Sequence, residues 1–370
     1  MPAAPLLLAF LVAAPVASAP DTVALLIRNG TVYDGSGAEG VRADVGVEDQ
    51  RIVFLGDAAA ADVHGRREID ATGLVVTPGF IDPHTHAGGD LGSEERAPRE
   101  NLNYLMQGVT TVLVGNDGGG SSDVAGTRAA YDSRGIGTNA ALLVGFGEVR
   151  GEVMGMADRP PTHEELERMK ALVDHAMLDG AVGLSTGLFY TPQNFSTTAE
   201  VVELAKVAAS YGGVYDSHLR DESSYNIGLL GSVAEAIEIG REARIPVNIS
   251  HIKALGVDVW GQADSALALI AAARAAGQEV TADQYPYEAS GTSVGASLLP
   301  RWAQADGRDS LLARMDRAET RTRLVADMGE NLRRRNGPDA ILITGGSDES
   351  IVGKTLAEIA LERGVDPVEA

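Results

Sequence analysis

From residue 75 onward the sequence alternates short apolar segments with amphipathic ones, and this pattern constrains the fold most. Apolar runs of this length between turn residues predict buried strands, and the intervening segments carry helix signals. Residues 162–165 (THEE) form a capping box that opens a helix ending near Gly180, and Thr197 opens the next helix. Strands alternating with helices favour a parallel sheet, and seven such units predict an α/β, TIM-like (β/α)8 barrel. The predicted strands span 75–82, 110–116, 140–145, 181–185, 213–217, 246–250 and 279–283.

The C-terminal part of this pattern has no clear final strand. Residues 340–350 (AILITGGSDES) are a candidate, but residues 321–335 (RTRLVADMGENLRRR) and their surroundings read as an inserted helical region. Residues 353–370 read as one helix followed by the start of another. We therefore expect residues 76–370 to form a barrel that lacks its final strand.

Two segments precede the barrel. Residues 1–19 have the short apolar core and small-residue end of a secretory signal peptide, although no Lys or Arg precedes the core and Pro20 follows it. We expect a periplasmic or secreted protein without a stable membrane anchor, because the core is too short to span a bilayer; the alternative is a cytoplasmic protein. Residues 22–75 contain alternating apolar runs between turn dipeptides such as Asn29-Gly30, which predicts a small antiparallel β-sandwich module.

Charge and cysteine content exclude several classes of function. The formal net charge of −22 and the pI near 4.6 argue against nucleic acid or an anionic membrane as partner. The chain has no cysteine, which excludes disulfides, thiolate nucleophiles and thiolate-ligated zinc.

Five metal-binding side chains fall at the carboxyl ends of predicted strands, where a barrel of this kind places its chemistry. His84 and His86 follow the first strand and, one residue apart, point to the same side of an extended chain. Asp117 follows the second strand, His218 the fifth and His251 the sixth. Each histidine by itself could simply pack, and Asp117 could be a turn residue before three glycines. Four of the seven histidines at strand ends nevertheless favour a zinc or two-metal site.

Several longer motifs resemble those of one known family. GFIDPHTH (79–86), with single histidines ending strands five and six, resembles the amidohydrolase superfamily. Four further motifs resemble those of the N-acyl-D-amino-acid deacylases, or D-aminoacylases. They are GAVGLSTGLFYTP (180–192), GGVYDSHLRDES (212–223), PVNISHIKA (246–254) and VTADQYPYEASGTS (280–293). The resemblance extends from about Val23 to the last residue.

Two departures from related families bear on the metal. Cyclic amidases with this barrel bridge two metals through a carbamylated lysine ending strand four, and none of Lys170, Lys206, Lys253 and Lys354 lies there. The D-aminoacylase group takes a ligand from strand two, usually a cysteine, and Asp117 occupies that position here. A carboxylate is a harder ligand than a thiolate and cannot be oxidised, which suits a periplasmic site.

The resemblance also implies substrate contacts. In that family the lysine after the strand-six histidine and the first tyrosine of YPY hold the substrate's α-carboxylate, which correspond to Lys253 and Tyr285. Tyr190 and Arg220 are further candidates, and Ser290 is a weaker one. The alternatives are packing for Tyr285 and, for Arg220, an ion pair with Asp221 or Glu222.

Zinc-dependent hydrolysis of the amide bond of N-acyl-D-amino acids, giving a carboxylate and a free D-amino acid, is the function that the resemblance implies. One tight zinc is expected at Asp117, His218 and His251, with a second, weaker divalent metal at the His84–His86 pair. The alternatives are a D-dipeptidase, a cyclic amidase of the same superfamily, and a non-catalytic periplasmic protein that binds acylated amino acids.

The general base of this superfamily is an aspartate ending strand eight. Asp348 lies in a similar GGSDES motif, but its segment resembles one that precedes strand eight in the family, so we expect the catalytic aspartate beyond Ala370. The 370-residue chain should therefore hydrolyse N-acyl-D-amino acids poorly, and a full-length protein should do so readily with zinc. A comparison of the two in an amino-acid release assay tests this, and equal activity would instead assign the base to Asp348.

Overall fold

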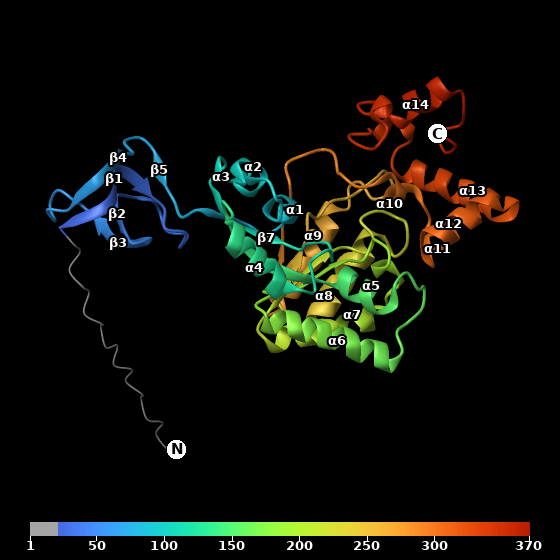
Figure 1. Ribbon diagram of the computed structural model, residues 1–370, viewed down its shortest axis with the longest axis horizontal. Helices are drawn as coiled ribbons and strands as arrows, with labels where there is room; N and C mark the ends of the chain where they lie inside the picture. The colour runs from blue at the N-terminus through green and yellow to red at the C-terminus, as the bar shows by residue number, and fades with distance from the viewer. Residues whose placement is uncertain (1–20) are drawn as a thin grey trace, which may run out of the picture. The chain divides into compact units, whose positions relative to one another are not determined.

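The structure, a computed structural model, describes residues 21–370 (Figure 1). The predicted signal peptide at residues 1–19 lies outside the described residues. The chain divides into two compact units, the first ending at Gly79 and the second beginning at Phe80. Among the helices of the described chain, none is both long and apolar enough to span a membrane.

The first unit contains five strands: β1 (Thr22–Val32), β2 (Val41–Glu48), β3 (Arg51–Gly56), β4 (His64–Asp70) and β5 (Val75–Val76). They form one mixed sheet in the order β3-β2-β1-β4, with β5 also on β1. β2 pairs antiparallel with β1 and β3, as predicted, whereas β4 and β5 run parallel to β1. The parallel pairs depart from the predicted antiparallel module, because the chain crosses from β3 to the other side of β1 before it enters β4. Val23, Leu26, Ala58 and Val63 form the buried core.

The second unit is built on seven parallel strands that follow one another in chain order. This order confirms the predicted βα units, and the curved sheet is that of an incomplete TIM barrel. All seven carboxyl ends lie at one edge of the sheet, where the loops that follow them meet. The strands are β6 (Phe80–Asp82), β7 (Val109–Val114), β8 (Asn139–Gly145), β9 (Gly183–Gly187), β10 (Val214–His218), β11 (Val247–Ile249) and β12 (Val280–Ala282).

Helices connect these strands, and consecutive long helices pack side by side against the sheet (Figure 1). Their apolar faces join the strands in a single buried core that includes Val144, Leu184, Tyr215 and Ile249. The helices up to β12 are α1 (Gly88–Leu91), α2 (Arg96–Arg99), α3 (Leu102–Leu105), α4 (Val124–Arg134), α5 (Phe146–Met154), α6 (His163–Leu178), the 3-10 turn η1 (Gln193–Phe195), α7 (Thr198–Ser210), α8 (Gly228–Ala243) and α9 (Ala263–Ala275).

A helical region follows β12, as residues 321–335 predicted. It contains α10 (Val294–Leu298), α11 (Arg301–Gln304), α12 (Gly307–Asp316), α13 (Ala318–Arg334), η2 (Pro338–Ala340), η3 (Glu349–Ile351) and α14 (Leu356–Arg363). Leu298, Leu332 and Leu356 form a small core of their own. Residues 340–350 do not extend the sheet, since Leu342 only bridges to Thr355. Within residues 21–370 the parallel sheet therefore has seven strands.

The N-terminus of α6 has the predicted capping box. The Thr162 side chain accepts a hydrogen bond from the Glu165 backbone N–H, and the Glu165 carboxylate accepts one from the Thr162 N–H. These bonds satisfy two of the donors that a helix N-terminus leaves unpaired. At the N-terminus of α7, the Thr197 side chain accepts a hydrogen bond from the Glu200 backbone N–H.

Loss of this cap should destabilise the second unit. Thr162→Ala removes the acceptor for the Glu165 N–H, and we expect the free energy of unfolding to fall by about 1 kcal/mol. Urea denaturation followed by far-ultraviolet circular dichroism measures it. Thr322→Ala is the control, because the Thr322 hydroxyl donates to Ala318 O inside α13 and alanine is the better helix former there. An equally large loss in both variants would contradict a specific role for the cap.

Candidate metal centre

A left-handed turn after β7 presents Asp117 to the centre of the strand ends. The φ angles of Asp117 and Gly118 are 57° and 74°, a conformation that reverses the chain immediately after the strand. Ser185 on β9 accepts a hydrogen bond from Gly118 N at 3.1 Å and fixes this turn. A side chain at Gly187 would place its Cβ 2.3 Å from Asp117 O, so the close approach of this turn to β9 requires glycine.

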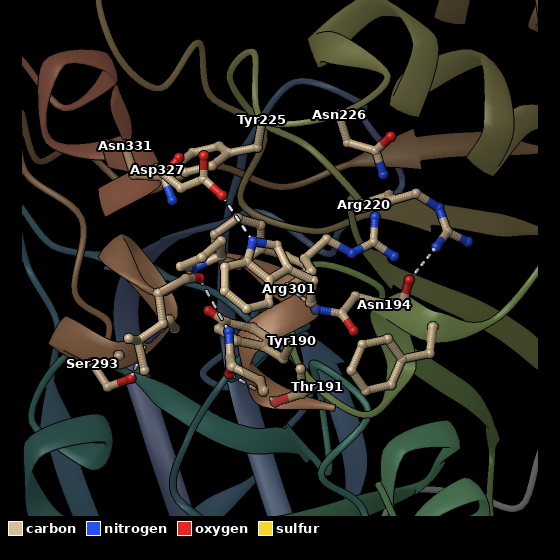
Figure 2. A pocket seen from close by; sticks show the side chains of 18 of the residues that line it. Tyr190, Thr191, Asn194, Arg220, Tyr225, Asn226, Ser293, Arg301, Asp327 and Asn331 are labelled. Carbon is tan, nitrogen blue, oxygen red and sulfur yellow. Dashed lines mark hydrogen bonds between the residues drawn. The ribbon is translucent and has the colours of Figure 1, made fainter. Parts of the chain in front are cut away.

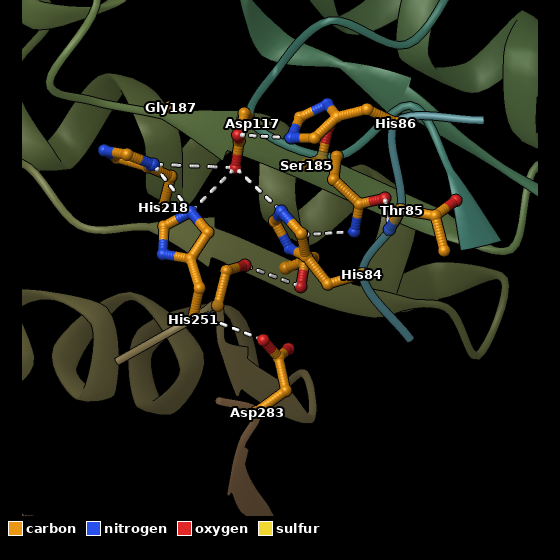
Figure 3. A network of polar contacts seen from close by, with 12 residues as sticks. His84, Thr85, His86, Asp117, Ser185, Gly187, His218, His251 and Asp283 are labelled. Atoms are coloured by element: carbon orange, nitrogen blue, oxygen red, sulfur yellow. Dashed lines mark hydrogen bonds and ion pairs between the residues drawn. The ribbon is translucent and has the colours of Figure 1, made fainter. Parts of the chain in front are cut away.

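Three side chains from different strand ends converge on one point (Figure 3). His218 Nδ1 lies 2.9 Å from His251 Nε2, and Asp117 Oδ1 lies 3.6 Å and 3.4 Å from these two atoms. Two nitrogens on a tetrahedral zinc are about 3.3 Å apart, given zinc–nitrogen bonds of about 2.0–2.1 Å. The three spacings are of this size, so Asp117, His218 and His251 can hold one ion.

The His84–His86 pair faces the same carboxylate from the segment after β6. His84 Nε2 lies 3.6 Å from Asp117 Oδ1, and His86 Nε2 lies 3.5 Å from Asp117 Oδ2. Thr85 between them donates to Leu113 O and Asn116 Oδ1, which anchors the segment on β7. His84, His86 and Asp117 thus form a second candidate ligand set, and Asp117 is common to both.

Two side chains in the cluster have buried polar atoms without a hydrogen-bond partner among the described residues. Both ring nitrogens of His84 and Oδ1 of Asp117 are in this state. Leaving such groups unsatisfied costs about 1–3 kcal/mol each in a folded protein. Nitrogen and carboxylate donors around a shared point are ligands for zinc, so the residues present fit a bound divalent metal.

The electrostatics of the cluster also fit a cation. Burial lowers the pKa of His84 to about 4, against the opposing charge of Asp117, so this imidazole is neutral and its lone pair is free. Burial also disfavours a charged His251, but its contacts with Asp117 and Glu222 outweigh burial and raise the pKa of His251 to about 9. Burial raises the pKa of Asp117 less than the histidines His218 and His251 lower it, so its carboxylate is ionised. A metal bound at this point would therefore displace a proton from His251.

A buried hydrogen-bond network fastens the strand ends beneath the cluster. Asp216 on β10 accepts from Asn116 Nδ2 at 3.0 Å, Asn248 Nδ2 at 2.9 Å and Ser250 Oγ at 2.9 Å. Asp283, after β12, accepts from Asn248 Nδ2 and from His251 N, both at 2.6 Å. Burial raises the pKa of Asp216 to about 6, although these three donors oppose the shift. These hydrogen bonds fix the carboxyl ends of four strands, β7, β10, β11 and β12, relative to one another.

The five metal-ligand candidates line a cavity of about 360 Å³ together with most of the predicted substrate contacts. Lys253, Tyr285, Tyr190 and Ser290 all lie on its wall. Lys253 Nζ donates to Glu222 Oε1 at 2.6 Å, contacts His251 Nδ1 at 2.8 Å and lies 5.4 Å from the centre of the Tyr285 ring.

Arg220 lies in a second, larger cavity of about 740 Å³ (Figure 2). It donates through Nε to Glu235 at 2.8 Å and through Nη1 to Asn194 O at 3.4 Å. Its ion pair is thus with Glu235 on α8 and not with Asp221 or Glu222. Phe189, Tyr190 and Tyr225 line both cavities. The substrate contact predicted for Arg220 stays a prediction.

Asp348 is exposed and caps a local turn by accepting from Ser350 N at 3.0 Å and Ser350 Oγ at 2.6 Å. It lines neither cavity.

Two charged residues line the cavity of about 360 Å³ (the metal cavity) but were not predicted as site residues from the sequence. Glu222 is buried and contacts both Lys253 and His251, at 2.6 Å and 3.1 Å. Its place four residues after His218 was a usable signal, since it follows the same strand end. Arg335 lines the cavity from the end of α13. No local signal could reveal it, because it reaches the cavity only through the packing of the helical region.

Gly187→Ala tests whether the turn that carries Asp117 must contact β9. The added Cβ would displace Asp117 O, and we expect zinc content to fall by more than about tenfold while the protein stays folded. Zinc content by atomic emission, with circular dichroism for folding, measures this. Gly329→Ala in α13 is the control, since no atom lies within 4 Å of its added Cβ. Full zinc content in Gly187→Ala would show that the contact does not position Asp117.

Comparison with known proteins identifies the family. The sequence model of the Amidohydrolase family matches residues 67–361. A D-aminoacylase from Alcaligenes xylosoxydans xylosoxydans is 38% identical over 293 residues, which are 73% of this chain and 58% of that protein. The chain thus spans a little over half the length of this curated relative.

Solved structures agree in fold. The N-acyl-D-glutamate deacylase from Bordetella bronchiseptica, solved with zinc and a phosphonate inhibitor, matches 94% of this chain and 69% of its own at 31% identity, with a TM-score of 0.77. A D-aminoacylase structure, reported with a binuclear metal centre in which one metal activates and the second attenuates, is 32% identical to this chain. It covers 94% of this chain and 69% of its own, with a TM-score of 0.75. The resemblance predicted from the motifs is confirmed: this chain belongs to the amidohydrolase family, within its D-aminoacylase group.

Proposed function

We propose that the protein hydrolyses the amide bond of N-acyl-D-amino acids with the help of zinc, releasing a carboxylate and a free D-amino acid. The observation that carries the proposal is the convergence of Asp117, His218 and His251 on one point at the wall of a cavity that also presents Lys253 and Tyr285. Relatives described as D-aminoacylase and as N-acyl-D-glutamate and N-acyl-D-aspartate deacylases support this substrate class.

Asp117, His218 and His251 would hold the tight zinc, and His84 and His86 would add a weaker second metal that shares Asp117. The first set is buried or nearly so, whereas the His86 side chain is 73% exposed and is held in place by fewer neighbours. A zinc ion there would supply Lewis-acid polarisation of the acyl carbonyl and a bound water with a pKa of about 7.

The cavity's own side chains would bind and orient the substrate. Burial raises the pKa of Tyr285 to about 12, helped by the negative charge of Glu222, and burial likewise raises the pKa of Tyr190 to about 12. Both phenols therefore keep their protons at neutral pH and can donate hydrogen bonds to a carboxylate or an acyl oxygen. Lys253 Nζ lies beside the Tyr285 ring as a further hydrogen-bond donor, with its charge paired to Glu222.

A carboxylate ligand in place of a thiolate also supports the proposed periplasmic location. A metal-bound thiolate is open to oxidation outside the reducing cytosol, and Asp117 is not. The signal-like residues 1–19 point to the same compartment.

The test is zinc analysis of the full-length protein combined with a screen of N-acetyl-D- and N-acetyl-L-amino acids for release of the free amino acid. We expect hydrolysis of D-enantiomers that is abolished by a chelator and restored by zinc. Tight binding of these compounds without turnover in the zinc-loaded protein would instead favour the non-catalytic binding protein.

Asp117→Ala should lower zinc affinity by more than about 100-fold and abolish zinc-dependent hydrolysis, because it removes the ligand that both sets share. Equilibrium dialysis against zinc and the release assay measure the two effects. Asp132→Ala is the matched control, since Asp132 is an exposed residue of α4 outside both cavities. Unchanged zinc affinity in Asp117→Ala would remove Asp117 from the metal site.

A further inference from the structure

Three consecutive arginines lie at the C-terminus of α13, the third as the residue directly after the helix, and they differ in their partners. Arg333 pairs with Asp258 at 2.7 Å and with Glu330 at 2.9 Å, and Arg334 lies 3.4 Å from Glu330. Arg335 has no carboxylate within ion-pair distance among residues 21–370. Its Nε donates to the Tyr225 hydroxyl at 2.6 Å, and its two terminal nitrogens have no hydrogen-bond partner in that range. Arg335 is therefore the member of the three whose charge is uncompensated by a described neighbour.

The end of α13 is fixed against the loops of the metal cavity. Arg334 Nε donates to Ser224 Oγ at 3.3 Å, and a Cβ at Gly256 would lie only 2.1 Å from Arg334 O. Gly256 belongs to the loop after β11, so the helix end touches the loops that follow both β10 and β11. This packing places Arg335 at the wall of the 360 Å³ cavity.

Tyr225 sets the direction of the Arg335 side chain. The Tyr225 hydroxyl accepts from Arg335 Nε and donates to Ser297 O at 3.0 Å, so both of its roles are used. The guanidinium carbon also lies 5.5 Å from the centre of the Tyr225 ring. Because Arg335 Nε already donates to Tyr225, the two terminal nitrogens of the guanidinium are left as a pair of donors. Such a pair can bind a carboxylate through two parallel hydrogen bonds.

The other cation of this cavity is already paired. Lys253 Nζ lies 2.6 Å from the Glu222 carboxylate, and Glu222 is buried, so the pair carries little net charge toward a ligand. An N-acyl amino acid brings a carboxylate into the cavity, and a chain with net charge −22 repels it at long range. Binding of this carboxylate therefore needs a nearby hydrogen-bond donor whose positive charge is not already paired with a carboxylate of the protein.

We propose that Arg335, oriented by Tyr225, supplies the unpaired positive charge that binds the carboxylate of the N-acyl amino acid substrate, beside the contacts predicted for Lys253 and Tyr285, and so selects for a free acid over its neutral derivatives. This inference rests on the proposed function. It makes the helical region after β12 a part of the substrate site, through a residue that determines specificity and takes no part in the bond cleavage.

The test compares two substrates in the full-length, zinc-loaded protein: the best N-acetyl-D-amino acid from the screen above, and its carboxamide. For Arg335→Met we expect kcat/KM for the acid to fall on the order of 10- to 100-fold, mainly through KM, because a charge-assisted pair is lost. The carboxamide should change less than about threefold, and zinc content should not change. Arg335→Lys keeps the charge without the fork and should fall between.

Arg308→Met is the matched control, an exposed arginine on α12 outside both cavities. It should leave both substrates unchanged. Equal losses for acid and carboxamide in Arg335→Met would show a merely structural role, and no loss for the acid would show that the carboxylate binds elsewhere; either result overturns the inference. If Arg335→Met does not fold, the acid-to-carboxamide ratio in Arg335→Lys decides in the same way. A protein that hydrolyses neither compound before mutation overturns the proposed function, and this inference with it.

Discussion

The Asp117 carboxylate is the group on which the rest of the site depends. Its Oδ1 lies within 3.4–3.6 Å of nitrogens of His84, His218 and His251, and its Oδ2 faces His86. A negative charge at this depth costs several kcal/mol unless it is compensated, and the histidines or a metal supply that compensation. The left-handed turn at Asp117, the glycine at 187 and the anchor from Ser185 all serve to place this one carboxylate.

Polar groups join the strand ends around Asp117, in addition to the apolar core that packs the strands against the helices. Asp216 joins Asn116, Asn248 and Ser250 in a network that is buried below the cluster. Since Asn116 follows β7, whereas Asn248 lies in β11 and Ser250 follows it, a shift of β10 against these strands would break several hydrogen bonds together. The network therefore gives the histidines a rigid base, which a metal site needs if its ligands are to be within a few tenths of an ångström of their places.

Much of the fold followed from local patterns. Seven apolar segments between helix signals predicted the parallel sheet, and the capping residues Thr162 and Thr197 marked where α6 and α7 begin. The meeting of the five candidate ligands was predictable too, because parallel strands of similar length end at the same edge, so side chains that follow them lie close together. The parallel pairing of β4 with β1 was not, because pairing partners depend on how the chain crosses the sheet.

Side-chain identity and position in the strand pattern thus decided which residues gather at the sheet edge, since backbone periodicity and chain order are local properties. Tertiary packing alone decided how their charges are used. Glu222 forms an ion pair with Lys253, and Glu235 forms one with Arg220, which lines the second cavity. Arg335 lines the metal cavity from the end of a helix more than a hundred residues beyond His218. Ion pairing depends on distances of a few ångströms between segments far apart in the chain, and no local pattern encodes those distances.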